Sequence, residues 1–318
     1  MGEYSFTEQS PLEEGFEAVF HERIVPILER HEAERLTLKR KAQMWMGGTG
    51  VAGLGGAGAA AGFENVPVAI TAAVAGGIGA FASRAVYQQR WKSGLGSELL
   101  PILCEFLGEM RYGDARINIG TFERLGVVPG HDSARTEDHV AGNHKGLDWA
   151  LAEAHLKSRT RDSKGRTKTT TVFRGLVFQI AVVQPAPRIY FAKDRGSMFN
   201  WVSETFSGTR KGMEKLEIPD EEFEATYEVY SDDIAAARDY IGPGVIEGLK
   251  TLARNEAKRS YIAAAFEGDW FYLALPRSGD FLSLGSLFRP TTDIEQDLHN
   301  ALWDLDLPRR AIDVITGR

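Results

Sequence analysis

The chain has 318 residues, of which 43% are hydrophobic, so it contains enough apolar material for a core of ordinary size. Its net charge of −7 argues against nucleic acid as the main partner of the whole surface. A single cysteine, Cys104, excludes an internal disulfide and fits a reducing compartment, and its place in an apolar helical run predicts a buried thiol.

Residues 1–42 are predicted to form an N-terminal amphipathic helix in the cytoplasm. Ser10, Pro11 and Glu13 mark the helix start, because serine caps a helix, proline suits its first position and glutamate can bond back to the cap. Apolar residues then recur at helical spacing, and Pro26 is expected to bend or break the helix. A charged stem over residues 32–41 completes the segment.

Residues 42–83 carry one charge, Glu64, which lies in a short polar break. Before the break, residues 47–63 include 8 glycines and 5 alanines. After it, residues 66–82 are Val, Ile, Ala, Gly and Phe with one Pro and one Thr. A helix needs about 20 residues to cross a hydrocarbon core of about 30 Å. The pattern predicts a glycine-rich transmembrane helical hairpin over residues 43–90.

The flanks of the hairpin indicate its orientation. Trp45, Tyr87 and Trp91 lie where an aromatic belt is expected. Both ends of the hairpin are basic, whereas its tip has no Lys or Arg; the basic residues are Arg35, Lys39, Arg40, Lys41, Arg84, Arg90 and Lys92. The positive-inside rule therefore places both termini in the cytoplasm. A signal peptide is a poor alternative, because the first 40 residues are charged throughout.

Three alternatives compete for the same stretch. Residues 48–53 spell GxGxxG, the dinucleotide fingerprint, but a charged helix precedes them where that fingerprint needs a strand. Glycine is a poor helix former in water, so a buried soluble helical hairpin or a flexible glycine-rich loop is the second alternative. The third, an amphipathic interfacial helix, needs a polar face that neither run has. The membrane hairpin is the favoured interpretation.

Small residues recur at helical spacing in the hairpin and let two backbones approach closely, which is how helices associate in lipid. The candidate helix-packing residues are Gly48, Ala52, Gly56, Gly58, Ala60, Gly62, Gly76 and Ala80. The simpler interpretation is that they close the hairpin. The alternative is contact with a second copy of the chain or with another membrane protein.

Residues 91–318 are predicted to form a cytoplasmic α+β domain with a mostly antiparallel sheet. One β-hairpin is expected to turn at Lys145-Gly146, and a second, of residues 261–266 and 270–275, at residues 267–269. Residues 169–183, 188–192 and 223–230 are further strand candidates. Ser231 is expected to cap a helix that ends at Gly242, and Pro243 to begin the next. Helices that cluster after the strands argue against βαβ units.

The order of these parts resembles a known family. An N-terminal helix with Phe16, Ile24 and Pro26 precedes the hairpin, and the last domain carries residues 172–176, Val-Phe-Arg-Gly-Leu, and 227–233, Tyr-Glu-Val-Tyr-Ser-Asp-Asp. The chain is similar in these features to the bacterial domain-of-unknown-function family 3137. The family has no established activity, so the resemblance implies architecture and a bacterial plasma (inner) membrane location, and no catalytic residue.

No residue is assigned a catalytic, cofactor-binding or metal-binding role. Four histidines between residues 131 and 155 lie near acidic residues, but their spacing matches no tight ligand pattern. Asp232 and Asp233 are neighbours at a helix start, where capping and the helix dipole explain them better than catalysis. Ser231 lacks a nearby histidine or glycine elbow to activate it.

One segment is strongly basic. Six positive charges fall within 12 residues between two strands: Lys157, Arg159, Arg161, Lys164, Arg166 and Lys168. The simplest interpretation is a solvated, mobile hairpin loop. The alternatives are contact with anionic lipid headgroups, to which each charge could add about 1 kcal/mol, and contact with an RNA or protein partner. No aromatic residues for base stacking are interleaved.

Two classes of function remain. The favoured one is a membrane-anchored, cytoplasm-facing binding or scaffolding protein whose ligand the sequence does not identify. The alternative is a membrane-tethered enzyme whose polar residues gather only when the sheet folds. A pocket with converging polar groups would favour the enzyme, and a flat basic or apolar surface would favour the binding protein.

Overall fold

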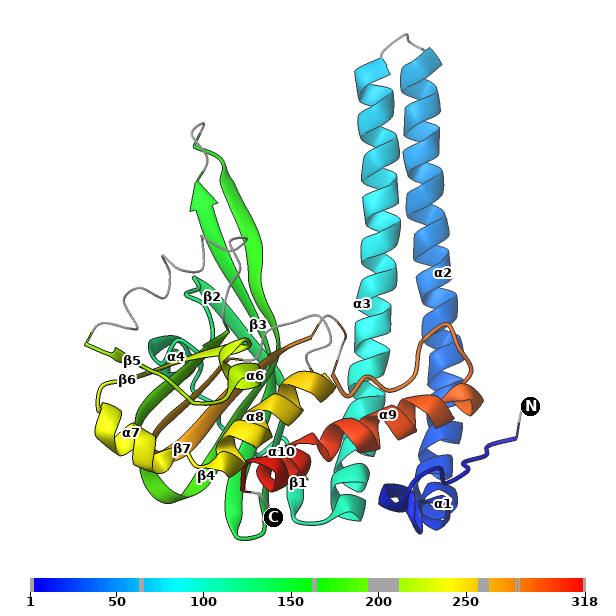
Figure 1. Ribbon diagram of the computed structural model, residues 1–318. Helices are drawn as coiled ribbons and strands as arrows, with labels where there is room; N and C mark the ends of the chain where they lie inside the picture. The colour runs from blue at the N-terminus through cyan, green and yellow to red at the C-terminus, as the bar shows by residue number, and fades with distance from the viewer. Residues whose placement is uncertain are drawn as a thin grey trace. The chain divides into compact units, whose positions relative to one another are not determined.

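The computed structural model describes residues 3–62, 66–161, 165–193, 212–256, 263–277, 279 and 281–316 (Figure 1). The chain divides into two compact units. Unit 1 comprises Met1–Phe106 and Leu282–Trp303, and unit 2 comprises Leu107–Phe281 and Asp304–Arg318. The sequence divides the chain at residues 42 and 90 instead. The two divisions differ because residues 282–303 return to the N-terminal helices, and local patterns do not reveal so distant a contact.

Unit 1 is built on two long helices. A 3₁₀ turn, η1 (Pro11–Glu13), a short helix, α1 (Phe16–Val19), and a π-helical turn, η2 (Phe20–Ile24), lead into α2 (Val25–Gly62). The second long helix, α3 (Val66–Leu107), runs back beside α2 (Figure 1). Pro26 lies in the first turn of α2, directly after the π-helical turn, where the missing N–H is tolerated. The expected break there is absent, and the helical run from Phe16 to Gly62 is continuous.

The half of the helix pair that contains the start of α2 and the end of α3 packs with coiled-coil spacing. Buried positions on the first helix alternate steps of four and three residues: Ile24, Leu28, His31, Arg35, Leu38 and Ala42. α3 contributes Trp91, Leu95, Leu99 and Leu103, all fully buried. The buried His31 is paired, since its Nε2 lies 2.8 Å from Glu98 Oε1. This stem is therefore a packed core with a polar link between its two helices.

The other half of the helix pair, which contains the end of α2 and the start of α3, corresponds to the predicted membrane hairpin. The two long antiparallel helices are present, but no helix in the described ranges is both long enough and apolar enough to cross a membrane. The predicted double crossing therefore lacks support. Glycine and alanine account for most of residues 47–62, and glycine contributes no apolar side chain.

Unit 2 contains a seven-stranded antiparallel sheet. Its strand order is β1-β2-β3-β4-β6-β5, and β7 pairs with the remaining edge of β4. The strands are β1 (Met110–Tyr112), β2 (Ser133–His144), β3 (Leu147–Arg161), β4 (Thr167–Lys193), β5 (Glu214–Leu216), β6 (Tyr227–Ser231) and β7 (Ala263–Pro276). The α+β prediction is confirmed, and β2 and β3 form the expected hairpin, with His144 opposite Leu147.

Two strand predictions are wrong. The strands predicted at 169–183 and 188–192 are one strand, β4, and the predicted second hairpin is one continuous strand, β7. Both halves of β7 pair with β4, and Gly268 lies opposite Ala186. Gly268 has φ +59°, so the Glu-Gly-Asp sequence forms an irregularity in a paired strand where a chain reversal was expected.

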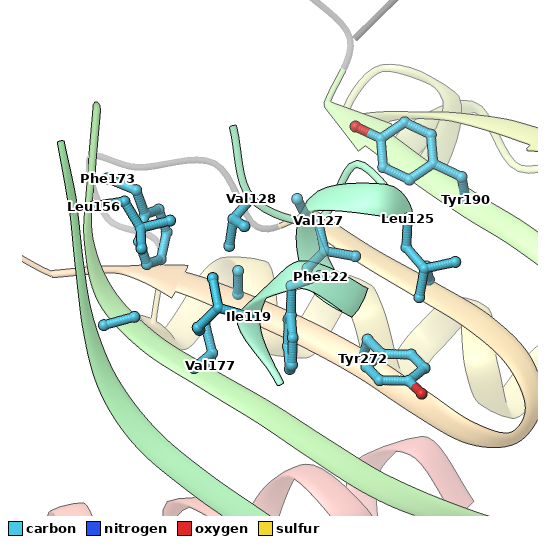
Figure 2. Close-up of a cluster of buried hydrophobic side chains, with 14 of the residues drawn as sticks. Ile119, Phe122, Leu125, Val127, Val128, Leu156, Phe173, Val177, Tyr190 and Tyr272 are labelled. Carbon is cyan, nitrogen blue, oxygen red and sulfur yellow. The ribbon is translucent and has the colours of Figure 1, made fainter. Parts of the chain in front are cut away.

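Helices lie against both faces of the sheet in unit 2. On one face, α4 (Ile119–Arg124) and the turn after it pack on the strands, as Figure 2 shows for Phe122 and Val127 beside Val177 and Tyr272. The other face carries an aromatic cluster that includes Phe191, Phe266 and Phe271. The helices α7 (Ile234–Tyr240), α8 (Pro243–Glu256) and α10 (Leu307–Thr316) lie on this face.

The remaining short elements belong to the connections. They are α6 (Glu221–Glu224), η3 (Thr291–Asp293) and α9 (Glu295–Leu305). Asp233, and not Ser231, is the N-cap of α7, since its side chain accepts a hydrogen bond from the Ala236 N–H. Ser231 instead donates its hydroxyl to the Arg188 carbonyl at 2.8 Å.

Candidate functional site

A segment of unit 1, residues 283–291, covers the stem of the two long helices. It contacts α3 through Gln88, whose side-chain oxygen accepts from the Leu287 N–H at 3.0 Å, and through Arg84, which lies 4.6 Å above the Phe288 ring. It contacts α2 through Arg35, which donates to the Leu287 carbonyl at 2.9 Å. The cover thus reaches up α3 as far as Arg84.

Above this cover the helices display apolar side chains. We call residues 43–83 the apolar hairpin, because the sequence places a single charge, Glu64, within it. Eight of its large apolar side chains are between 54% and 75% exposed: Met44, Trp45, Val51, Leu54, Ile70, Val74, Ile78 and Phe81. Large exposed apolar patches are rare on monomeric soluble proteins and mark sites that contact a protein partner or a membrane. Arg84, the first charged residue of α3, therefore both ends the apolar hairpin and contacts the segment that covers the stem.

The two helices of the apolar hairpin approach each other closely at Gly76. A Cβ atom at this position would lie 2.6 Å from the Gly53 Cα and 2.9 Å from the Thr49 carbonyl oxygen. A Cβ atom at Gly79 would lie 3.4 Å from the Thr49 Cβ, so Gly79 also faces Thr49. Thr49 and Gly53 were not among the candidate packing residues, although they are spaced four apart like the candidates.

The other candidate packing residues divide into two groups. Gly48, Ala52 and Gly56 are exposed, and a Cβ at Gly48 would meet no atom within 4 Å. The surroundings of Gly58, Ala60, Gly62 and Ala80 lie outside what the structure describes. The stripe of Gly48, Ala52 and Gly56 therefore lies on the outer surface of the hairpin.

The basic segment of unit 2 forms an extended two-stranded ribbon. Figure 1 shows β3 and β4 continuing beyond the neighbouring strands, and pairing persists to Arg161 opposite Thr167. The loop expected over residues 157–168 is therefore mostly strand, and Lys164 lies outside the described residues. We call the five described cations the basic ribbon: Lys157, Arg159, Arg161, Arg166 and Lys168.

Strand alternation divides the basic ribbon between two faces. Lys157, Arg159 and Arg161 share one face because side chains two apart in a strand point to the same side. Each is opposite a threonine of β4, at 171, 169 and 167 respectively. The register shifts between Leu156 and Lys157, but the shift lies in β4 and leaves the alternation of β3 intact.

The same face continues down the sheet with further cations. Arg135 and Arg174 are both opposite His155, one on each neighbouring strand. Burial, together with the positive charges of Lys157 and Arg174, lowers the pKa of His155. Arg174 also pairs with the buried Glu153, its Nε lying 3.1 Å from Glu153 Oε1. Sequence reasoning missed Arg135 and Arg174 because only the strand register brings them to this face.

The residues considered for catalysis or metal binding are dispersed. His144 contacts Asp313 at 2.7 Å, whereas His155 contacts Thr171 at 3.2 Å. Within the described ranges, no group of three or more His, Cys, Asp and Glu side chains is placed to hold a metal ion. Burial raises the pKa of the Cys104 thiol to about 12, which keeps it protonated and unreactive. The GxGxxG letters lie inside α2, away from any strand-to-helix turn.

These observations define an α+β protein in which an antiparallel sheet accompanies a long helical hairpin with a bare apolar end. Residues 171–313 match the family described as "Protein of unknown function (DUF3137)", so the family predicted from the sequence is confirmed for this part of the chain. One solved structure, "crystal structure of the mycobacterial trehalose monomycolate transport factor A, TtfA", is 10% identical, with a TM-score of 0.24 over 62% of this chain and 97% of that chain. The comparison with curated proteins gave no match.

Proposed function

We propose that the protein is a membrane-anchored binding or scaffolding protein whose apolar hairpin lies in a lipid bilayer. The observation that supports this most strongly is the set of eight exposed apolar side chains, all within the stretch that carries a single charge. Lipid is the partner that suits them because the exposed apolar side chains lie on both helices, and a bilayer can surround both helices at once.

Eight exposed apolar side chains are enough to hold the protein stably on a bilayer. Fully burying a large apolar side chain contributes about 1.5 to 3 kcal/mol, and these side chains are already partly covered. At about 1 kcal/mol each, the eight side chains would contribute about 8 kcal/mol, which corresponds to about a millionfold preference for the bilayer. This exceeds the marginal binding that one myristoyl chain provides.

The charges beside the hairpin support one orientation. A hairpin that enters from one side of the membrane leaves both of its stems on that side. Lys39, Arg40 and Lys41 precede the apolar hairpin, and Arg84 and Arg90 follow it. Basic residues next to a membrane segment favour the cytoplasmic side. We therefore place both termini in the cytoplasm, at the bacterial plasma (inner) membrane.

The basic ribbon supports a second contact, with anionic lipid headgroups. Its five described cations are exposed, and each charge near an anionic surface contributes about 1 kcal/mol before the cost of ordering. An acidic protein is the alternative partner of these cations, and vesicle-binding experiments distinguish it from anionic lipid. The outward stripe of Gly48, Ala52 and Gly56 supports a further contact within the membrane, with a second copy or another membrane protein.

The proposal is tested by making the outer surface of the hairpin polar. Replacing Val51, Leu54, Ile78 and Phe81 with serine leaves Thr49, Gly53 and Gly76, the contact between the helices, unchanged. The wild-type protein should float with vesicles of neutral phosphatidylcholine, and the variant should remain in the aqueous fraction. Leu36→Ser is the matched control, because Leu36 is 50% exposed on the same helix but lies in the charged stem. Flotation of the fourfold variant at the wild-type level would refute the proposal.

A further inference from the structure

Unit 2 contains a cavity of about 330 Å³ that is open to solvent, on the face of the sheet opposite α4. Its floor is formed by β4 and β7 and its sides by α7, α8 and α10. The apolar walls consist of Ile180, Val182, Val245, Phe266, Phe271 and Ile312. Binding pockets for small molecules begin at about 300 Å³. The cavity is therefore of the size of a ligand site.

The cavity lies where the pairing between β4 and β7 is interrupted. β4 and β7 pair without interruption from Gly175 to Ala181, and the register then shifts before pairing resumes at Ala186. Residues 182–184 of β4, which line the cavity, fall within this interruption. Val183 is 67% exposed there, so an apolar side chain lies where the cavity meets solvent.

Four of the described lining residues have polar side chains: Gln184, Asp239, Tyr240 and Thr316. The Tyr240 hydroxyl donates to the Gln184 carbonyl at 3.2 Å, and the Thr316 hydroxyl donates to the Ile312 carbonyl at 2.8 Å. Asp239 is the one charged residue among the described lining residues, and it is exposed. A ligand in this cavity would thus meet mostly apolar residues and one charged group, the Asp239 carboxylate.

We propose that this cavity binds the hydrocarbon chain of a single-chain amphiphile whose neutral or cationic head group donates to Asp239. At about 30 Å³ for each water-sized group, 330 Å³ accommodates about 11 such groups, which suits a chain of about ten carbons. The negative charge of Asp239 disfavours a carboxylate head. This inference does not depend on membrane attachment, because every lining residue that the structure describes belongs to unit 2.

Binding is measured on the full chain with primary alcohols of six to twelve carbons, followed by decylammonium and decanoate. Each added methylene should tighten binding by about fourfold until the chain fills the cavity. Decylammonium should bind more tightly than decanoate, and Asp239→Asn should reduce that preference. A photoreactive diazirine alcohol identifies the location without any variant: crosslinks should fall in peptides that contain residues 180–184 or 240–245.

Two neighbouring residues of α8 provide matched variants. Val245 and Ile246 are both half-buried, but only Val245 lines this cavity. Val245→Glu should weaken decanol binding at least tenfold, and Ile246→Glu should leave it unchanged, with thermal melting used to confirm that both variants fold. Crosslinks confined to residues 43–83, or equal binding by the two folded variants, would overturn the proposal.

Discussion

Substitution of Gly76 by alanine should push the two helices of the apolar hairpin apart. The added Cβ would lie 2.6 Å from the Gly53 Cα, which is about 1 Å inside the usual carbon–carbon contact of about 3.5 to 4 Å. The nearest atoms are backbone, so no side chain can rotate away. Gly77 is the matched control, because a Cβ there would meet no atom within 4 Å.

Gly76→Ala should leave the protein less stable than Gly77→Ala does. Alanine is better than glycine in a helix by about 1 kcal/mol, so Gly77→Ala should stabilise unit 1 slightly. Gly76→Ala gains the same propensity but incurs an overpacking cost of about 1 to 3 kcal/mol. The difference between the variants, measured by thermal unfolding followed by circular dichroism, should be about 1 to 3 kcal/mol, or about 4 to 12 °C in Tm. Equal melting temperatures for the two variants would refute the close approach at Gly76.

Three further outcomes are expected. Burial acts to raise the pKa of Glu13, but hydrogen bonds from Gln9 and His299 outweigh it, so the pKa is lowered. The ionised Glu13 therefore stabilises the fold fully above the unfolded pKa of about 4.5, and this stabilisation is lost as the pH falls through the folded pKa. Glu13→Gln should therefore lower Tm at pH 7 and progressively less below pH 4.5, and a constant difference would contradict this. Gly175→Ala should destabilise unit 2 by more than about 3 kcal/mol, since its Cβ would lie 2.1 Å from the Leu275 carbonyl oxygen, whereas Gly242→Ala, in open space, should be tolerated. Replacing the basic ribbon residues with serine should remove the extra binding to anionic over neutral vesicles without changing Tm, and raising salt from about 0.1 M to 1 M should have the same effect; an unchanged preference for anionic vesicles would exclude the ribbon as the contact.

The sequence predicts the elements whose signals are local. The long uncharged stretch indicates two adjacent helices, and Lys145-Gly146 indicates the turn between β2 and β3, both of which the structure contains. The single strand β7 could not be predicted in the same way. Glu-Gly-Asp between two apolar runs is compatible with a hairpin turn or with an irregular strand, and only pairing with β4 on both sides of Gly268 selects the second.

The candidate site was predictable in composition but not in arrangement. The positive charges of residues 157–168 can be counted in the sequence, whereas Arg135 and Arg174 join their face only through the register with His155. The packing of residues 283–291 on the stem is still harder to predict from the sequence, because Arg35 and Leu287 are 252 residues apart. The step pattern from Ile24 to Ala42 was the available signal for a coiled-coil stem, and it indicates where the covered part of α2 ends.

The central claim, that the apolar hairpin lies in lipid, is tested most directly by spin labels on α2. A label at Leu54→Cys, in phosphatidylcholine vesicles, should be relaxed by dissolved oxygen and shielded from a water-soluble nickel chelate. A label at Leu36→Cys, in the charged stem, should show the opposite pattern, and the buried Cys104 should not react with the labelling reagent. Equal access of the nickel chelate to both labels would contradict the account.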